Sequence, residues 1–358
     1  MIEMENIALV VGATGITGSN LAEKLIEKGW KTYGLARNPN TDIAGLVPIS
    51  ADLLDIKDLN TKLRDIAPTH VFFTTWMRND TEAENIRVNS AMVRNLLDSL
   101  SPKKSVQHVA LVTGLKHYLG PFEAYAKAGT LPETPVREEH PRLNLENFYY
   151  AQEDEVYAAA ARDGFTWSIH RPHSVIGKAV GNLMNMGTTL AVYATICKET
   201  GRPFRFPGSG AQWNGLSDVT DAVVLAEHLI WASTTEAARN EAFNVANGDV
   251  FRWNWLWKQI AVWFAVEPAG FDGTIHTLEE EMANDADSWK DLAAKYNLKE
   301  TDINRLASPW HTDLDLGRPM EVLTDMSKSR KLGFTVYQDT RDSFFNLFEK
   351  LRLENLIP

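Results

Sequence analysis

The chain has 358 residues, 44% of them hydrophobic, so it can bury a large core and is too long for a single dinucleotide-binding unit. Its 47 acidic residues outnumber 36 basic ones, and a formal net charge of −11 argues against nucleic acid or an anionic membrane as a partner. Cys197 is the only cysteine, and no segment has the pattern of a signal peptide or a membrane span, so we expect a cytoplasmic protein.

The first predicted strand leads directly into a glycine-rich turn. Residues 7–11 are apolar, and Gly12, Gly15 and Gly18 follow before an amphipathic helix. This pattern is typical of a dinucleotide cradle, in which the glycines allow a tight turn, close approach of the pyrophosphate and close helix–strand packing. A glycine turn without a ligand is the alternative, but the elements on both sides favour a bound dinucleotide. The cradle residues are Gly12, Thr14, Gly15, Ile16 and Gly18.

The second predicted strand, residues 31–36, indicates which dinucleotide binds. An NAD enzyme would carry Asp or Glu at the end of this strand, whereas this chain has Arg37 and Asn38. An acidic side chain would repel a 2′-phosphate and an arginine can bind it. The sequence therefore predicts NADP(H), with an exposed loop charge at Arg37 as the alternative interpretation.

Strands and helices alternate through the first half of the chain, which predicts an α/β fold with a Rossmann-type, doubly wound parallel sheet. Asp52 and Leu53 follow the third strand, where a carboxylate could approach the adenine amine. Thr74, Thr75 and Trp76 lie at the end of the fourth strand and are also assigned to the cofactor site. The third to sixth strands are expected at residues 47–51, 70–75, 106–113 and 166–171.

The composition changes after about residue 175, where glycine and asparagine become frequent and aromatic-rich helices follow. We therefore predict an NADP-binding Rossmann domain over residues 1–175 and a smaller, mainly helical substrate-binding lobe over residues 176–358. A segment near residues 241–247 is expected to return to the main sheet. Cys197 lies in an apolar segment and is predicted to be a packed core thiol, and the tryptophans of residues 253–263 fit helical core packing.

The usual catalytic pair of short-chain dehydrogenases is missing. In those enzymes Tyr and Lys stand four residues apart on one helix, where the ammonium lowers the pKa of the phenol. None of the nine tyrosines here has a lysine four residues later. Instead, Lys116 follows the fifth strand, at the carboxyl edge where doubly wound folds bind ligands, and a helix begins with the doublet Tyr149-Tyr150.

These segments resemble the atypical short-chain reductases typified by plant progesterone 5β-reductase and iridoid synthase, the PRISE enone reductases, and their bacterial members. The resemblance covers nearly the whole chain. Its most specific element is Asn147-Phe148-Tyr149-Tyr150 followed by Glu153-Asp154. Supporting matches lie at residues 74–76, 113–123, 167–172 and 241–244.

The resemblance implies reduction of activated C=C bonds of enones and enals with NADPH, with Lys116 and Tyr149 as the catalytic pair. Hydride addition to the β-carbon leaves negative charge on the carbonyl oxygen, and Tyr149 would donate a hydrogen bond there. Lys116 would keep positive charge near the phenol and hold the ribose hydroxyls. For Tyr150 an aromatic core position is the favoured interpretation.

The same resemblance extends the predicted sites. The cofactor site gains Thr113, Lys116, Tyr149 and His173. The apolar substrate pocket is expected to include Trp76, Phe122, Tyr149 and Met184, with a core role for Trp76 and Phe122 as the alternative. His173 departs from the family, which usually carries glycine there, and would narrow the space near the nicotinamide. His170 and His173 lack a nearby Cys or acidic partner, so no metal site is predicted.

Two other functions remain open at this point. A nucleotide-sugar epimerase or dehydratase shares the extended fold, but would be expected to carry the helical Tyr/Lys pair. A non-catalytic NADP-sensing regulator would bind the cofactor without turning over an enone. The expected partner is a small apolar enone or enal; no nucleic acid and no membrane is expected, and a homodimer is left open.

Overall fold

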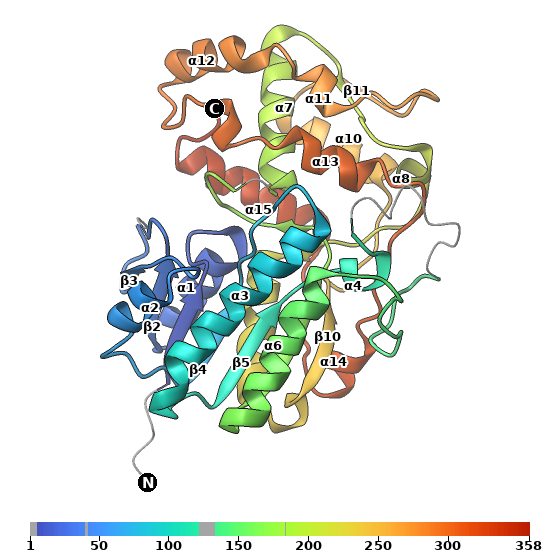
Figure 1. Cartoon of the computed structure of the whole chain (residues 1–358). Helices are drawn as coiled ribbons and strands as arrows, with labels where there is room; N and C mark the ends of the chain where they lie inside the picture. Colours follow the sequence, from blue (N-terminus) through green and yellow to red (C-terminus); the bar gives the residue numbers. More distant parts are fainter. Residues whose placement is uncertain (1–5, 40–41, 122–132, 183) are drawn as a thin grey trace. The chain divides into compact units, whose positions relative to one another are not determined.

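The computed structural model describes residues 6–39, 42–121, 133–182 and 184–358. The chain divides into two compact units (Figure 1). The first unit comprises Met1–His173, Val223–Val245 and Asp325–Val336. The second comprises Ser174–Ala222, Ala246–Thr324 and Tyr337–Pro358.

The first unit is built on a seven-stranded sheet in the order β10-β6-β5-β4-β1-β2-β3, and every pair of neighbours is parallel. The chain runs outward from β1 to β3 and then crosses back to β4, so the gap between β1 and β4 is the topological switch point of a doubly wound sheet. The predicted fold class is confirmed. The strands are β1 (Ile7–Val11), β2 (Lys31–Ala36), β3 (Val47–Ser50), β4 (His70–Phe73), β5 (His108–Val112), β6 (Thr166–Pro172) and β10 (Glu241–Val245).

Helices cover both faces of this sheet. On one face α3 and α6 run side by side (Figure 1), and alternate strand residues such as Leu9, Val71 and Val109 share a buried core with residues of these helices. On the other face α9 packs against β6, and Glu227 of α9 lies 3.1 Å from Lys28, just after α1. The helices of this unit are α1 (Ile16–Glu27), α2 (Ile56–Lys62), α3 (Glu82–Leu100), α4 (Lys116–Leu119), α6 (Phe148–Asp163), α9 (Ala222–Thr234) and α14 (Ser327–Lys331), with short 3₁₀ turns at Ser101–Lys103 and Glu236–Ala238.

Four buried histidines cross the α9-covered face of the sheet, and we call them the histidine row. His70 and His108 are register partners on β4 and β5. His108 and His170 share the Ser168 hydroxyl at 2.9 and 2.8 Å, and His170 Nδ1 lies 3.0 Å from His228 Nδ1. Burial lowers their pKa values, to about 4 for His70, to about 3 for His108 and His228, and well below the ordinary value for His170.

The second unit is mainly helical, with two short parallel strand pairs, β7–β9 and β8–β11. Trp257 stacks on Phe204 with ring centres 3.9 Å apart, as expected for core packing, whereas Trp255 on the same helix is exposed. Cys197 is buried, and burial raises the pKa of its thiol to about 12, which agrees with an inert core position. The elements are α7 (Met186–Thr200), α8 (Gly210–Asn214), α10 (Trp253–Phe264), α11 (Leu278–Glu281), α12 (Asp285–Tyr296), α13 (Pro309–Leu316), α15 (Thr340–Leu353), a 3₁₀ turn at Ile303–Arg305, β7 (Val175–Ile176), β8 (Phe204–Arg205), β9 (Thr220–Asp221) and β11 (Pro268–Ala269).

In the described ranges, no helix combines the length and the apolar character that crossing a bilayer requires.

Candidate active site

The glycine turn after β1 is too crowded for side chains. Gly12 has a φ of +87°, and a Cβ there would lie 2.7 Å from Cβ of Thr75. A Cβ on Gly18 would collide with the carbonyl oxygen of Gly12, so α1 packs directly against the turn. Gly15 occupies the N-cap position of α1 and donates its backbone N–H to the Gly12 carbonyl at 3.0 Å. The turn therefore brings backbone groups and a helix N-terminus to the carboxyl end of β1.

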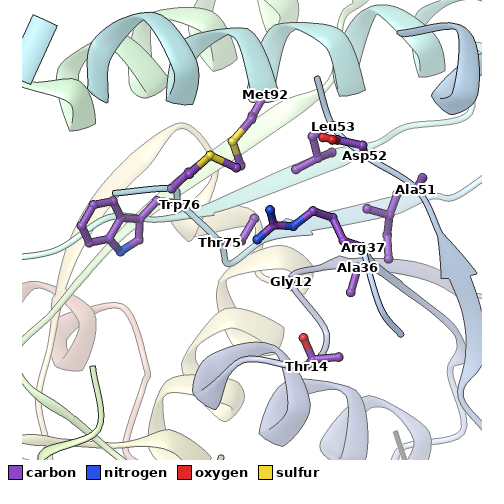
Figure 2. A pocket seen from close by; sticks show the side chains of 12 residues that line it. Gly12, Thr14, Ala36, Arg37, Ala51, Asp52, Leu53, Thr75, Trp76 and Met92 are labelled. Carbon is purple, nitrogen blue, oxygen red and sulfur yellow. The ribbon is translucent and has the colours of Figure 1, made fainter. Parts of the chain in front are cut away.

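A pocket opens at the switch point, beside this turn (Figure 2). It encloses about 560 Å³ of space, part of it open to solvent. Residues from the ends of β1, β2, β3 and β4 line it, as expected for ligand binding in a doubly wound sheet. The lining residues are Gly12, Thr14, Leu35, Ala36, Arg37, Ala51, Asp52, Leu53, Thr75, Trp76, Met77 and Met92.

Arg37 brings a positive charge into this pocket. Figure 2 shows its side chain extending between Asp52 and Leu53 on one side and the Gly12 turn on the other. The Ser50 hydroxyl donates to the Arg37 carbonyl at 2.9 Å, which ties the turn after β2 to the end of β3. Asp52 accepts the backbone N–H of Leu54 at 2.9 Å. A cationic group at the end of β2 suits an anionic ligand group.

Several of the other predicted cofactor residues contribute to the ends of the strands. Thr74 donates both its N–H and its hydroxyl to the Val11 carbonyl, at 3.0 and 2.7 Å, and so fixes the end of β4 against β1. Thr113 donates its backbone N–H to the backbone carbonyl of His170 at 2.8 Å. His173 is buried just after β6. Asn38 is exposed in the turn after β2, and Ile16 is buried at the start of α1.

Lys116 and Tyr149 meet in an aromatic cluster, although they come from different helices. The Lys116 ammonium lies 4.5 Å from the ring centre of Trp76, 4.7 Å from that of Phe148 and 5.8 Å from that of Tyr149. Trp76 stacks on Phe148 at 4.9 Å, and Phe148 contacts Tyr149 at 4.4 Å. Both Lys116 and Tyr149 are buried, at 7% exposure each. A Cβ on Gly114 would lie 3.4 Å from the Tyr149 hydroxyl, so the phenol reaches the carboxyl end of β5.

Asn147 connects the two residues, a link that the sequence does not predict. Its side-chain Oδ1 accepts the backbone N–H of Tyr149 at 3.0 Å and thereby caps α6. Its Nδ2 donates to the Lys116 carbonyl at 2.7 Å. The residue type and its place before a predicted helix indicate the cap, but only the folded chain reveals the bond to Lys116.

Tyr150, the second residue of the doublet, has a structural role, because its hydroxyl hydrogen-bonds to backbone groups of the protein. Its hydroxyl donates to the His117 carbonyl at 2.6 Å and accepts the Leu143 N–H at 2.9 Å. The Arg142 guanidinium lies 4.9 Å from its ring centre. The Tyr150 phenol therefore joins α6 to α4 and to the segment that precedes α6.

Residues from distant segments form a buried polar network around Glu153. Glu153 accepts a 2.7 Å bond from Arg142 and lies 3.6 Å from Arg171. Arg171 donates to the Tyr118 hydroxyl at 3.0 Å, and Tyr118 donates to Asn244 at 2.7 Å. Burial raises the pKa of Glu153, which the two arginines oppose, and burial raises the pKa of Tyr118 to about 12. The network joins α4, α6, β6 and β10.

The sequence also predicts Phe122 and Met184 as pocket residues. Phe122 lies outside the described residues. Met184 lies in the second unit before α7, where its backbone N–H donates to Asn182 at 2.9 Å. Within the described ranges, no group of three His, Cys, Asp or Glu side chains could hold a metal ion.

Comparison with known proteins identifies the family. Residues 46–358 match the PRISE-like Rossmann-fold domain family. The chain belongs to this family. It is 39% identical to an (S)-8-oxocitronellyl enol synthase of Camptotheca acuminata, over 99% of this chain and 94% of the relative. It is 38% identical to a 3-oxo-Δ4,5-steroid 5β-reductase of Arabidopsis thaliana, with the same coverage of 99% and 94%.

Both relatives align with almost the whole of this PRISE-like chain, so the likeness includes the glycine turn that precedes residue 46. A UDP-glucose 4-epimerase of Thermotoga maritima has a similar structure, with a TM-score of 0.69, 14% identity, and coverage of 97% of this chain and 99% of the epimerase. At that identity the likeness establishes a shared extended fold. The PRISE-like chain lacks the helical Tyr/Lys spacing that we expected of an epimerase.

Proposed function

We propose that this protein is an NADPH-dependent reductase that adds hydride to the β-carbon of α,β-unsaturated ketones and aldehydes. The observation that carries the proposal is the convergence of Lys116 and Tyr149 at the carboxyl edge of the sheet, with the Lys116 ammonium 5.8 Å from the phenol ring. The relatives support the same reaction class, because one is named as a reductase of a Δ4,5-unsaturated 3-oxosteroid and others as oxocitronellyl enol synthases.

The residues around the glycine turn fit a dinucleotide. Positions 12 and 18 are too closely packed for a side chain, so α1 begins directly against the turn, where its N-terminal backbone groups could bind a pyrophosphate. Arg37 supplies positive charge at the end of β2, where it would bind the 2′-phosphate that distinguishes NADPH from NADH. Asp52 would face the adenine, and Thr75 and Trp76 would line the path toward the reacting end.

When bound, NADPH supplies the hydride. Tyr149 would hold the carbonyl oxygen of the enone by donating its phenolic hydrogen bond, and this bond strengthens as negative charge develops on that oxygen. The Lys116 ammonium would stabilise the same charge from beside the phenol ring and would bind the ribose hydroxyls. The stacked rings of Trp76 and Phe148 would exclude water from Lys116, so its charge acts in a medium of low polarity. Protonation of the α-carbon would come from water.

The test is NADPH consumption by the purified protein with a panel of small apolar enones and enals. We expect NADPH oxidation only with conjugated carbonyl compounds, because an unactivated alkene cannot accept the displaced charge. Unactivated alkenes and saturated ketones of the same size are the matched controls. NADPH binding without turnover of any panel member would indicate a sensor, and interconversion of nucleotide sugars without net NADPH loss would indicate an epimerase.

A further inference from the structure

The Asn147 side chain hydrogen-bonds to the backbone of both proposed catalytic residues. It is 3% exposed, and both ends of its amide are used. Oδ1 accepts from the Tyr149 N–H at 3.0 Å, and Nδ2 donates to the Lys116 carbonyl at 2.7 Å. One rigid planar group therefore sets the separation between the backbones of Lys116 and Tyr149.

Capping alone does not require an asparagine. The start of α6 has a second acceptor, because Glu82 Oε1 accepts the Phe148 N–H at 2.7 Å. Any short side chain with an oxygen can cap a helix. Elsewhere in this chain Asp55, Thr81 and Asp339 cap α2, α3 and α15 with oxygen atoms. The Asn147 amide adds a hydrogen-bond donor, Nδ2, which is directed away from α6 and bonds to the carbonyl of Lys116, the first residue of α4.

The bond to Lys116 acts on a short element. The helix α4 has four residues, too few to be stable without external contacts. Lys116 begins this helix, so little regular structure holds its backbone. Displacement of a catalytic group by about 1 Å can lower a rate by as much as 100-fold. A bond that fixes the Lys116 backbone is therefore expected to affect the chemical step.

We propose that Asn147 is a positioning residue, which holds the Lys116 ammonium beside the Tyr149 phenol by joining the first residue of α4 to the first turn of α6. The inference rests on the proposed enone reduction. It assigns to the Asn147 amide a role in turnover that is separate from its role as a helix cap.

The test uses two variants and one matched control. Asn147→Ser keeps an oxygen for the cap but is too short to reach Lys116. Asn147→Asp keeps the shape and the cap, and as a carboxylate it lacks the donor. Tyr150→Phe removes the 2.6 Å bond from Tyr150 to His117, which also joins α6 to α4 but does not involve Lys116. Melting temperature, the dissociation constant for NADPH, kcat and KM are measured for each.

We expect Asn147→Ser to fold, to leave the KM for the enone near the wild-type value and to lower kcat by about 10- to 100-fold. NADPH binding should weaken less than in Lys116→Met, because the ammonium is displaced and not removed. Asn147→Asp should lower kcat to a similar extent while it keeps the cap, because its carboxylate has no donor for the Lys116 carbonyl. Tyr150→Phe should lose thermal stability with a much smaller loss in kcat.

The inference fails if Asn147→Ser turns over at the wild-type rate, or if Tyr150→Phe and Asn147→Ser lose kcat equally, since general loosening between α4 and α6 would then explain both. Should Asn147→Ser not fold, Asn147→Asp decides alone, and a wild-type kcat in this variant counts against the donor role. If the wild-type protein turns over none of the enones and enals tested, the proposed function is refuted, and this inference fails with it. If the wild-type protein reduces an enone and Asn147→Ser reduces it at the same rate, only the inference about Asn147 is refuted.

Discussion

The Lys116 ammonium lies 5.8 Å from the centre of the Tyr149 ring, although Lys116 begins α4 and Tyr149 lies in the first turn of α6. In common short-chain dehydrogenases one helix carries both groups at a spacing of four residues. Here the carboxyl end of β5 and the start of α6 bring them together instead. The arrangement of the Lys116 ammonium and the Tyr149 phenol therefore depends on tertiary contacts, and the following variants test the role of each group.

Removing the Tyr149 hydroxyl should slow the reductive step and leave the fold intact. Tyr149→Phe is expected to lower kcat for an enone by about 100- to 1,000-fold, the usual effect of losing one donor to a developing oxyanion. The loss should be smaller for a matched enal, which is more electrophilic and needs less help at oxygen. Steady-state rates with both substrates, together with thermal melting, provide the measurement. An unchanged kcat with the enone in a well-folded Tyr149→Phe would exclude Tyr149 as the donor.

Lys116 is assigned to two tasks, so its removal should affect two quantities. Lys116→Met keeps an unbranched chain that can still pack against the Trp76 and Phe148 rings, but it removes the charge. We expect a lower kcat and a higher dissociation constant for NADPH, measured by fluorescence titration. A variant with normal NADPH affinity and reduced kcat would restrict Lys116 to the chemical step, and one with normal values for both would contradict the assignment.

Arg37 should select NADPH over NADH. Arg37→Ala is expected to weaken NADPH binding by roughly 1.5–3 kcal/mol, the typical contribution of a charge-assisted bond, with little effect on NADH. Arg87→Ala is the matched control, because Arg87 is exposed on α3 and pairs with Glu84 away from the pocket residues. Titration of the six protein–cofactor combinations gives the answer. Equal affinity of the wild-type protein for NADH and NADPH would refute the selection.

The histidine row predicts a loss of stability in mild acid. Burial lowers the pKa values of His70 and His108 to about 4 and about 3, whereas the unfolded chain binds protons near pH 6.5. The unfolded state therefore binds more protons below pH 6.5, and the free energy of unfolding falls as the pH decreases toward the folded pKa values. Each histidine should contribute a loss of roughly 1.4 kcal/mol between about pH 7.5 and pH 5.5.

Urea unfolding at the two pH values measures this effect, and His228→Leu tests its origin. Burial lowers the pKa of His228 to about 3, so removing this site should reduce the pH-dependent loss by roughly 1.4 kcal/mol, whatever the variant does to stability at neutral pH. A pH dependence that is the same in wild type and His228→Leu would show that the row does not titrate in this way.

The sequence predicted the elements that depend on local pattern. The predicted bounds of β1 and β2 agree with the structure, because apolar strands ended by glycine or by polar turn residues are defined within a few positions. The predicted fourth strand extended to residue 75, whereas β4 ends at Phe73. There, Thr74 uses its hydroxyl for the Val11 carbonyl, a contact that no local pattern reveals.

The parts that the sequence did not predict depend on which strands become neighbours. His70, His108 and His170 are scattered along the chain, and only the register of β4, β5 and β6 aligns them. Met92 reaches the pocket from α3, where helical periodicity indicates a core residue equally well. The bond from Asn147 to Lys116 likewise requires knowing that α4 and α6 begin at the same edge of the sheet.

The central claim is that hydride is added to the C=C bond, and the position of a label tests it most directly. The purified protein is incubated with NADPH that carries deuterium at the transferred C4 position and with a small apolar enone, and the product is analysed by NMR. We predict deuterium at the β-carbon of a saturated ketone, because Tyr149 and Lys116 stabilise charge on the carbonyl oxygen. Deuterium at the carbonyl carbon of an allylic alcohol would contradict the account and identify a carbonyl reductase instead.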